Sequence, residues 1–396
     1  MRVSMWTYPW DVQDLTAERV TAELRDAGVD TVSLATSYHA GRFLQARSPV
    51  RKTFYPEDGT IYFNPTPGRW ADQTLQPRVA RVVSEGGDVL ADLVRRRDEA
   101  GGLRVSGWTV CLHNSRLGLL HPEIVTRNCF GEPSTFNLCP SHPAARSYVA
   151  MLVEDLSASY KPDAIELESA GFMGYAHDYH HEKDGVGLLP EDDLLLSLCF
   201  CPACLARAAT ARVDGESARA TVRRWVEEAL ARPVPVPRWP NLLTEGPDAF
   251  GLTPEVHDYM MWRFEPVTSL LAEIRERADL ATEILVIDLE DGWLGGSDLE
   301  AAAAVCDGAI LCAYDMVPDE VAALLRAGRD AVGPEKFLGT GFRLMYPEMC
   351  APADIADRTA AALAADCDGI NFYNYGLVPL ARLDWVRQAL EGRTAR

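Results

Sequence analysis

The stretch GAILCAYDMVPDEVAALLRAG (residues 308–328) contains the pattern that decides the fold. A short apolar run, 308–315, leads directly into a segment whose apolar residues have helical spacing. A β-strand followed at once by a helix is the repeating unit of parallel α/β proteins. Three more such units complete the second half of the chain, with strands predicted at 284–290, 337–343 and 369–376.

The first half repeats this alternation with longer connections between the units. Strands are predicted at 2–8, 31–38, 104–113 and 164–169. A helix is predicted at 15–28, which Thr16 can cap at its start and Gly28 at its end. Eight strand–helix units in series predict a (β/α)8 TIM barrel that spans residues 1–396 as one catalytic domain.

Long insertions follow three of the predicted strands, at 39–75, 114–140 and 170–253. The third insertion is long enough to form a subdomain. In a (β/α)8 barrel the loops after the strands build the active site. We therefore expect the functional residues of this chain at the strand ends and in these insertions.

Composition excludes several classes of partner. The formal net charge is −20 at pH 7, which argues against binding of nucleic acid or of an anionic membrane surface. No apolar run approaches the roughly 20 residues of a spanning helix, and no cationic segment with an apolar run opens the chain. We expect a soluble, cytoplasmic protein. Helices of the compact second half could pair in a homo-oligomer, although the sequence shows no recognisable subunit interface.

The segment LCFCPACLARA (198–208) holds Cys199, Cys201 and Cys204 in C-x-C-x2-C spacing. A structural zinc ion needs a fourth ligand to complete a tetrahedron. Cys139 is the first candidate because its loop lies beside the loop after the fourth strand, and Cys129 is the alternative. The alternative interpretation is that the three cysteines are reduced thiols that bind no metal ion. Thiolates packed this closely would, however, repel one another without a cation.

The segments LCPSHPAARSY (138–148) and CFCPACLARA (199–208) resemble, in order and kind, the four-cysteine zinc site of the β-galactosidases of glycoside hydrolase family 42. The resemblance covers these motifs and the order of the barrel. It implies a glycosidase barrel with a structural Zn2+ that joins two loops at the barrel mouth. It also implies an acid/base glutamate at the end of the fourth strand.

The carboxylates of the fourth and fifth strands agree with a glycosidase, which needs two carboxyl groups at one site. In AIELES (164–169), Glu166 and Glu168 alternate with apolar residues, so both are predicted to face the barrel interior, with Glu168 nearer the mouth. The resemblance places the acid/base glutamate at Glu168. In VIDLED (286–291) the same alternation predicts that Asp288 and Glu290 face inward, with Ile287 and Leu289 toward the helices.

The second catalytic carboxylate is left open by the sequence. Family 42 takes its nucleophile from the end of the seventh strand, where GTGFRLMYPE (339–348) offers Arg343 instead. The candidates are Glu290, Asp288, Asp315 and Glu348. Neighbouring strands lie about 4.8 Å apart. Glu290 would therefore suit the short carboxyl separation of a retaining enzyme, and Asp315 the longer separation of an inverting enzyme.

Aromatic and polar side chains at the predicted strand ends suit a small carbohydrate substrate. Aromatic faces can stack on pyranose rings, and amides and imidazoles can bind hydroxyl groups. The residues predicted to bind substrate are Trp6, Tyr8, His39, His113, Tyr314, Arg343 and Asn374. His181 joins them from the histidine-rich segment YAHDYHHEK (175–183), for which a solvated loop or a metal site are the alternatives.

The leading hypothesis from the sequence is a glycoside hydrolase that cleaves a small glycoside or oligosaccharide without a catalytic metal or an organic cofactor. A divalent-metal-dependent sugar isomerase or lyase is the first alternative. Its cation would be held by Glu168, Asp288, Glu290 and His113. The missing glutamate on the seventh strand motivates the second alternative, a carbohydrate-binding barrel without catalysis.

Overall fold

The structure is a computed structural model that describes residues 1–100, 102–177, 181–289 and 291–391. Within this part of the chain, eight parallel strands form a closed barrel in the order β1-β2-β6-β9-β10-β11-β12-β13, and β13 pairs back with β1. The strands are β1 (Arg2–Thr7), β2 (Thr31–Tyr38), β6 (Arg104–Val110), β9 (Ala164–Glu168), β10 (Glu283–Asp288), β11 (Gly308–Cys312), β12 (Phe337–Arg343) and β13 (Gly369–Tyr373). The predicted (β/α)8 barrel and its eight strands are confirmed.

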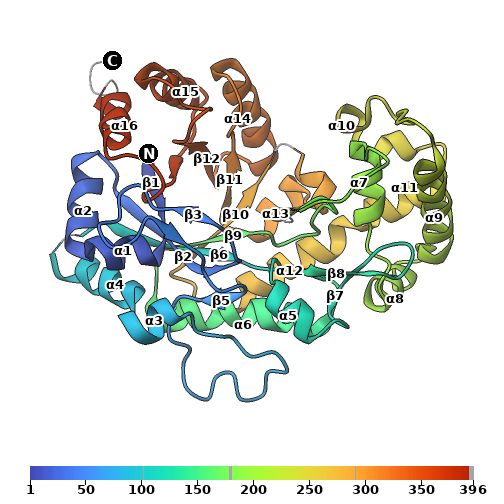
Figure 1. The fold of residues 1–396 in the computed structure, drawn as a ribbon, viewed down its shortest axis with the longest axis horizontal. Coiled ribbons are helices and arrows are strands. Elements are labelled where there is room, and N and C mark those ends of the chain that lie inside the picture. Colours follow the sequence, from blue (N-terminus) through green and yellow to red (C-terminus); the bar gives the residue numbers. More distant parts are fainter. Residues whose placement is uncertain (101, 178–180, 290, 392–396) are drawn as a thin grey trace.

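Helices surround the barrel on the left of Figure 1. They are α1 (Pro9–Leu15), α2 (Ala17–Asp26), α3 (Arg81–Gly86), α4 (Val89–Ala100), α6 (Pro143–Tyr160), α12 (Phe264–Arg277), α13 (Leu299–Val305), α14 (Pro318–Val332), α15 (Pro352–Ala364) and α16 (Ala381–Glu391). In α14 the buried residues Val321, Leu325, Gly328 and Val332 follow one helical face. A Cβ on Gly328 would lie 2.5 Å from the Leu311 side chain, so glycine lets this helix approach β11 closely.

The loops after β2 and β6 carry small elements. These are β3 (Phe43–Leu44), β4 (Thr53–Phe54), β5 (Thr60–Ile61), α5 (Ser115–Leu120), β7 (Val125–Arg127) and β8 (Pro133–Leu138). β5 adds antiparallel to β2 and β7 pairs with β8. The predicted insertions at 39–75 and 114–140 therefore contain short strands and one short helix.

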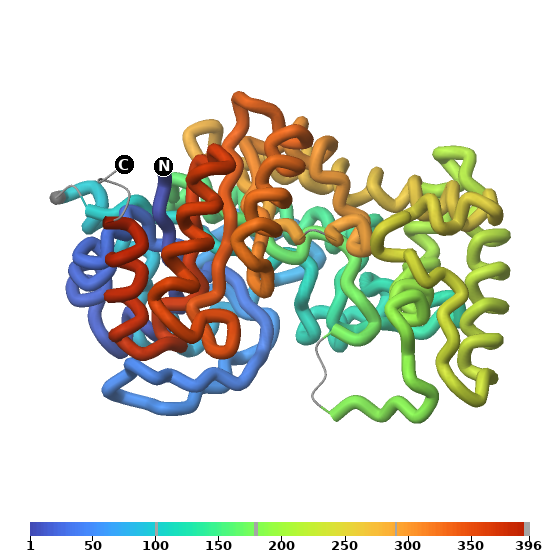
Figure 2. Tube along the Cα trace, turned by 90° about the horizontal axis from the view of Figure 1, so that it is seen from above, coloured from blue at the N-terminus to red at the C-terminus, as the bar shows by residue number. Residues whose placement is uncertain are grey.

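The insertion after β9 forms a helical extension beside the barrel, on the right of Figure 1 and also projecting in the turned view of Figure 2. It holds α7 (Pro190–Ser197), α8 (Pro202–Thr210), α9 (Gly215–Ala231), α10 (Leu242–Glu245), η1 (Gly246–Phe250) and α11 (Pro254–Trp262). Trp225, Trp239 and Phe250 pack together inside it, with ring centroids 4.9 Å apart in two of the pairs. Because α11 packs on α9, the extension continues past residue 253.

No single helix in the described ranges is long and apolar enough to cross a membrane. The pair α7 and α8 together would have the length and composition, and the two helices are bent by 85°.

The register of β10 corrects one prediction about the carboxylates. Leu285 pairs with Glu166 of β9 and shares the interior face of the barrel, whereas Ile284 and Val286 pack in the cluster between strands and helices. Asp288 follows Val286 on this outer face, and Ile287 packs against the interior cluster. The predicted inward orientation of Asp288 is wrong. Barrel strands are buried on both faces, so alternation alone does not tell inside from outside.

Candidate active site

A cavity of about 710 Å3 opens at the C-terminal ends of the barrel strands. Five of the residues predicted from the sequence line it, namely Trp6, Glu168, Asp288, Tyr314 and Arg343. Tyr38, Trp108 and Tyr373 complete an aromatic end of the cavity, where the Trp6 and Trp108 rings are 6.1 Å apart. The strand ends thus bring carboxylates, aromatic rings and one guanidinium into a single space.

Glu168 is the carboxyl group at the C-terminal end of β9. Trp108 Nε1, on the neighbouring strand β6, donates a hydrogen bond of 2.5 Å to Glu168 Oε2. Burial raises the pKa of the Glu168 carboxyl, against the opposing effects of the indole hydrogen bond and the charge of His113. A raised pKa favours the protonated form of a carboxyl group, which is the form that a general acid needs.

Glu166 lies two residues deeper in β9 and is fully buried beneath the cavity. Its Oε2 accepts hydrogen bonds of 2.7 Å from Trp6 Nε1 and from Ser33 Oγ, and Asn371 Nδ2 lies 3.3 Å from both carboxylate oxygens. These donors satisfy the buried carboxyl group, whose pKa is nevertheless raised by burial. Through the indole hydrogen bond, Glu166 holds the Trp6 ring that lines the cavity.

Asp288 reaches the cavity from the end of β10. Ser297 Oγ donates a hydrogen bond of 2.6 Å to its Oδ2, and the backbone N–H of Leu289 donates one of 2.8 Å to its Oδ1. Burial raises the pKa of Asp288, while these two hydrogen bonds favour the ionised form. It is the second predicted carboxylate that the structure brings to the same cavity as Glu168.

The other predicted carboxylates are placed differently. Asp315 is exposed beyond the end of β11 and does not line the cavity. Glu348 forms an ion pair of 3.2 Å with Arg343, whose guanidinium lies 4.4 Å from the centre of the Tyr314 ring. The predicted residue Glu290 lies outside the described residues.

Two predicted substrate-binding residues lie behind the cavity wall instead of in it. The buried Tyr8 hydroxyl is 3.0 Å from the Tyr38 hydroxyl and 2.7 Å from that of Tyr373. Asn374 is buried, and its Oδ1 accepts a hydrogen bond of 3.0 Å from the backbone of Gly376. Tyr8 positions two lining tyrosines, so its contribution to a ligand is indirect.

Histidines gather at the ends of β2 and β6. The His39 and His113 rings are stacked with centroids 4.2 Å apart, and His113 meets His177 edge-on at 5.0 Å. Of these three, His177 lines the cavity. His181 is exposed and is not among the lining residues, so the structure does not bring it to the candidate site.

Sequence reasoning missed several lining residues. Trp108 shares the inward parity of Ser106 and Val110 on β6, and this alternation was a readable signal. Asp193 and Ser197 come from α7 of the helical extension, and Asp291 from the loop after β10. No local pattern marks these last residues, because they reach the cavity only through the packing of separate elements.

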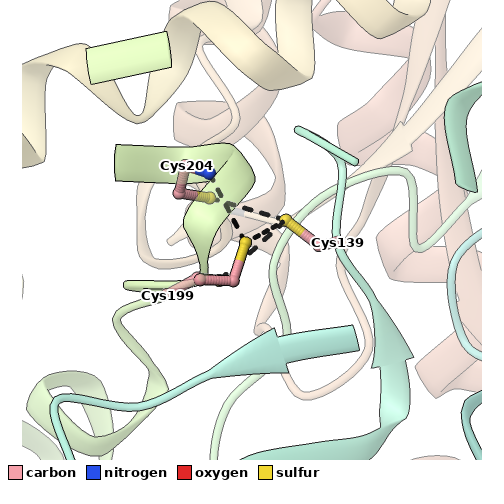
Figure 3. A group of neighbouring side chains, drawn as sticks. Cys139, Cys199 and Cys204 are labelled. Atoms are coloured by element: carbon pink, nitrogen blue, oxygen red, sulfur yellow. Dashed lines mark hydrogen bonds between the residues drawn. The ribbon is translucent and has the colours of Figure 1, made fainter. Parts of the chain in front are cut away.

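The four-cysteine cluster lies where the loop after β8 meets the extension. Figure 3 shows Cys139 facing Cys199 and Cys204 from the opposite segment. Cys139 Sγ is 3.9 Å from the sulfur of Cys199 and 3.5 Å from those of Cys201 and Cys204. The prediction that Cys139 is the fourth member is confirmed, and Cys129 is not part of the group.

The cluster has the dimensions of a metal site. Four sulfurs at about 2.3 Å from a zinc ion form a tetrahedron with edges of about 3.8 Å, which the observed separations match. The backbone N–H groups of Arg127 and Cys204 point at the Cys199 and Cys201 sulfurs, at 3.3 and 3.4 Å. Across the described ranges, this is the one group of histidine, cysteine and acidic residues close enough to hold a metal ion.

No protein-family model matches this chain, and no curated protein matches its sequence. The chain is similar in structure to the catalytic domain of the β-amylase of Paenibacillus polymyxa, with a TM-score of 0.58 and 11% identity over 99% of this chain and 98% of that one. The likeness is one of fold.

A second solved structure leads to the same result. The PgaB (BpsB) glycoside hydrolase domain of Bordetella bronchiseptica has a TM-score of 0.55 and 13% identity to this chain, with 98% of each chain covered. The barrel is therefore one that glycoside hydrolases use. Such low identity carries no residue roles from those proteins to this one.

Proposed function

We propose that this protein is a glycoside hydrolase in which Glu168 is the general acid. The observation that carries the proposal is the placement of Glu168 in the cavity, with its carboxyl group held by Trp108 and its pKa raised by burial. The glycosidase fold of the two similar structures supports the class. The cysteine motifs and the position of Glu168 at the end of β9 support a family-42-like enzyme.

The reaction follows from the two carboxyl groups of the cavity. Protonated Glu168 donates its proton to the glycosidic oxygen as the bond to the anomeric carbon breaks. Trp108 holds Oε2, so Oε1 is the oxygen available to the substrate. We assign Asp288 as the second carboxylate, because the hydrogen bonds from Ser297 and Leu289 favour its ionised form at the same cavity.

We also infer that the four-cysteine cluster binds Zn2+ in a structural role. Burial raises the pKa of Cys139 and Cys204, so a cation is needed to keep all four sulfurs as thiolates. A zinc ion held by four cysteines has no open position for substrate. A zinc ion bound here would hold the loop after β8 against the start of α8.

The test is hydrolysis of a panel of alkyl and 4-nitrophenyl glycosides by wild type and variants. Glu168→Gln is expected to lower kcat on alkyl glycosides by 100-fold or more, the scale of a general acid. The loss on 4-nitrophenyl glycosides should be smaller, because nitrophenolate leaves with little need of a proton. This difference between leaving groups separates a lost acid from a disturbed fold.

Two further variants complete the design. Asp288→Asn should lower kcat on both substrate types, and exposed Asp315→Asn is the matched control that should retain activity. Unchanged turnover in Glu168→Gln would overturn the assignment. A panel on which folded, zinc-loaded wild type shows no turnover would overturn the class.

A further inference from the structure

The cavity at the barrel mouth has a second end that lies outside the barrel wall. Its aromatic end is lined by Trp6, Tyr38 and Trp108, which belong to the hydrophobic cluster inside the barrel. The other end is lined by Val267 and Leu271 of α12 together with Val286 of β10, Phe172 and Leu294. We name these five residues, of which all but Phe172 are aliphatic, the aliphatic compartment.

The members of the aliphatic compartment belong to the cluster between strands and helices. Phe172, Val267, Leu271 and Val286 are buried members of that cluster, and Leu294 packs against it. The cavity therefore connects two hydrophobic clusters that the barrel wall otherwise separates. Glu168 and Asp288 both line this cavity, Glu168 from the interior face of β9 and Asp288 from the outer face of β10.

The wall of the compartment is built by close packing of two loops. The backbone N–H of Phe172 donates a hydrogen bond of 2.8 Å to the carbonyl of Gly295, in the short helix η2 (Gly292–Gly295). A Cβ on Gly171 would lie 2.5 Å from that same carbonyl oxygen, so glycine permits this approach. The carboxyl groups of Asp193, Asp288 and Asp291 line the same cavity.

We propose that the substrate is a glycoside with a neutral, apolar aglycone, which occupies the aliphatic compartment while the sugar occupies the aromatic end. The proposal rests on the glycosidase function proposed above. In the reaction the bond between the anomeric carbon and the bridging oxygen breaks. The Glu168 proton goes to that oxygen to give the free alcohol. Water supplies the hydroxyl group at the anomeric carbon, and its other proton passes to the carboxylates of the site, which restores the protonated form of Glu168.

The chemistry of the compartment disfavours the other leaving groups. The hydroxyl groups of a second sugar would lose hydration against the apolar side chains of the compartment. An anionic aglycone would meet the carboxyl groups of Asp193, Asp288 and Asp291. A neutral hydrocarbon group has no hydroxyl groups to desolvate and no charge to be repelled. Each methylene that it buries adds to binding.

The experiment compares methyl, butyl and hexyl glycosides, whose alcohols have similar acidity and differ in apolar length. The sugar and anomer are those that the glycoside panel selects. We expect kcat/KM to rise about threefold per methylene, so that the hexyl glycoside, longer by five methylenes, exceeds the methyl glycoside by about 240-fold. A matched hexyl glycoside with a terminal carboxylate should lose most of this gain.

A substitution that fills the compartment tests whether the dependence of kcat/KM on chain length arises there. Leu294→Trp should abolish the dependence of kcat/KM on chain length, so that the methyl and hexyl glycosides are hydrolysed with similar kcat/KM. Leu299→Trp is the matched control, because Leu299 is also half-buried against the same cluster but does not line the cavity. Equal kcat/KM for all three alkyl glycosides, or an unchanged dependence in Leu294→Trp, would overturn the compartment and leave the glycosidase function standing.

Binding distinguishes this outcome from a failure of the glycosidase function. If no alkyl glycoside is hydrolysed, the dissociation constants of methyl and hexyl glucosides and galactosides are measured by calorimetry with wild type and Leu294→Trp. Tighter binding of the hexyl compounds that Leu294→Trp removes would support the compartment in a protein that does not hydrolyse them. Equal binding of the methyl and hexyl compounds would overturn it.

Discussion

At the scale of single residues, the pairing of Trp108 with Glu168 gives the clearest consequence. The indole N–H favours the ionised carboxylate and so lowers a pKa that burial raises. Because a general acid works in its protonated form, activity should fall as pH rises through this pKa. Trp108→Phe removes the donor, raises the pKa further and should move the basic limb of the kcat/KM profile to higher pH.

The control for this profile is Trp70→Phe. Trp70 Nε1 also donates to a buried carboxylate, that of Asp155 at 2.8 Å, but neither residue lines the cavity. The basic limb should therefore stay where it is in wild type. A limb that moves to lower pH in Trp108→Phe would contradict the role given to the indole.

At the scale of elements, α1 carries a buried carboxyl group against the loop after β13. Asp11 accepts a hydrogen bond of 3.0 Å from the backbone of Tyr8, and its side chain packs so closely on Gly376 that a Cβ there would lie 1.9 Å from Oδ1. Burial raises the pKa of Asp11 to about 7, against the opposing effects of the Tyr8 hydrogen bond and the charge of Arg47. An unfolded aspartate titrates near pH 4.

This difference makes stability depend on pH. The unfolded chain ionises Asp11 from about pH 4 upward while the folded chain keeps the proton to about pH 7, so wild type loses stability across that window. The unfolding free energy of Asp11→Asn minus that of wild type should therefore rise by about 3 kcal/mol from pH 5 to pH 7.5. Urea unfolding at several pH values measures it, with exposed Asp26→Asn as the control. A constant difference between Asp11→Asn and wild type across this range would refute the prediction.

At the scale of the whole molecule, the cysteine cluster connects the barrel to its helical extension. Cys139 follows β8, and the other three cysteines lie at the start of α8. Purified wild type should contain one zinc ion per chain, measured by mass spectrometry. Cys201→Ser should lose the metal and lower the melting temperature by about 5 °C or more.

Cys129→Ser provides the comparison, since Cys129 is buried but outside the cluster. It should keep the zinc ion. Brief treatment of wild type with EDTA should leave turnover unchanged, because the cluster is buried and a four-cysteine site offers no position to substrate. Loss of turnover with a rapid return on adding Mg2+ or Mn2+ would favour the metal-dependent isomerase or lyase instead.

Local patterns in the sequence determined the eight strands, their order in a (β/α)8 barrel, the cysteines of the cluster and the position of Glu168. Each rests on residues close together in the chain, where periodicity and spacing directly reflect local geometry. The choice of Cys139 over Cys129 also followed, because its loop adjoins the loop after the fourth strand.

Only the tertiary structure decided which way Asp288 faces, which donor holds Glu168, and that His181 stays away from the cavity. It also created the aliphatic compartment, whose lining residues range from Phe172 to Leu294 in the chain and come from separate elements. The physical reason is that a strand buried on both faces has no polar side to orient it. Contacts between distant segments depend on packing, which local periodicity does not encode.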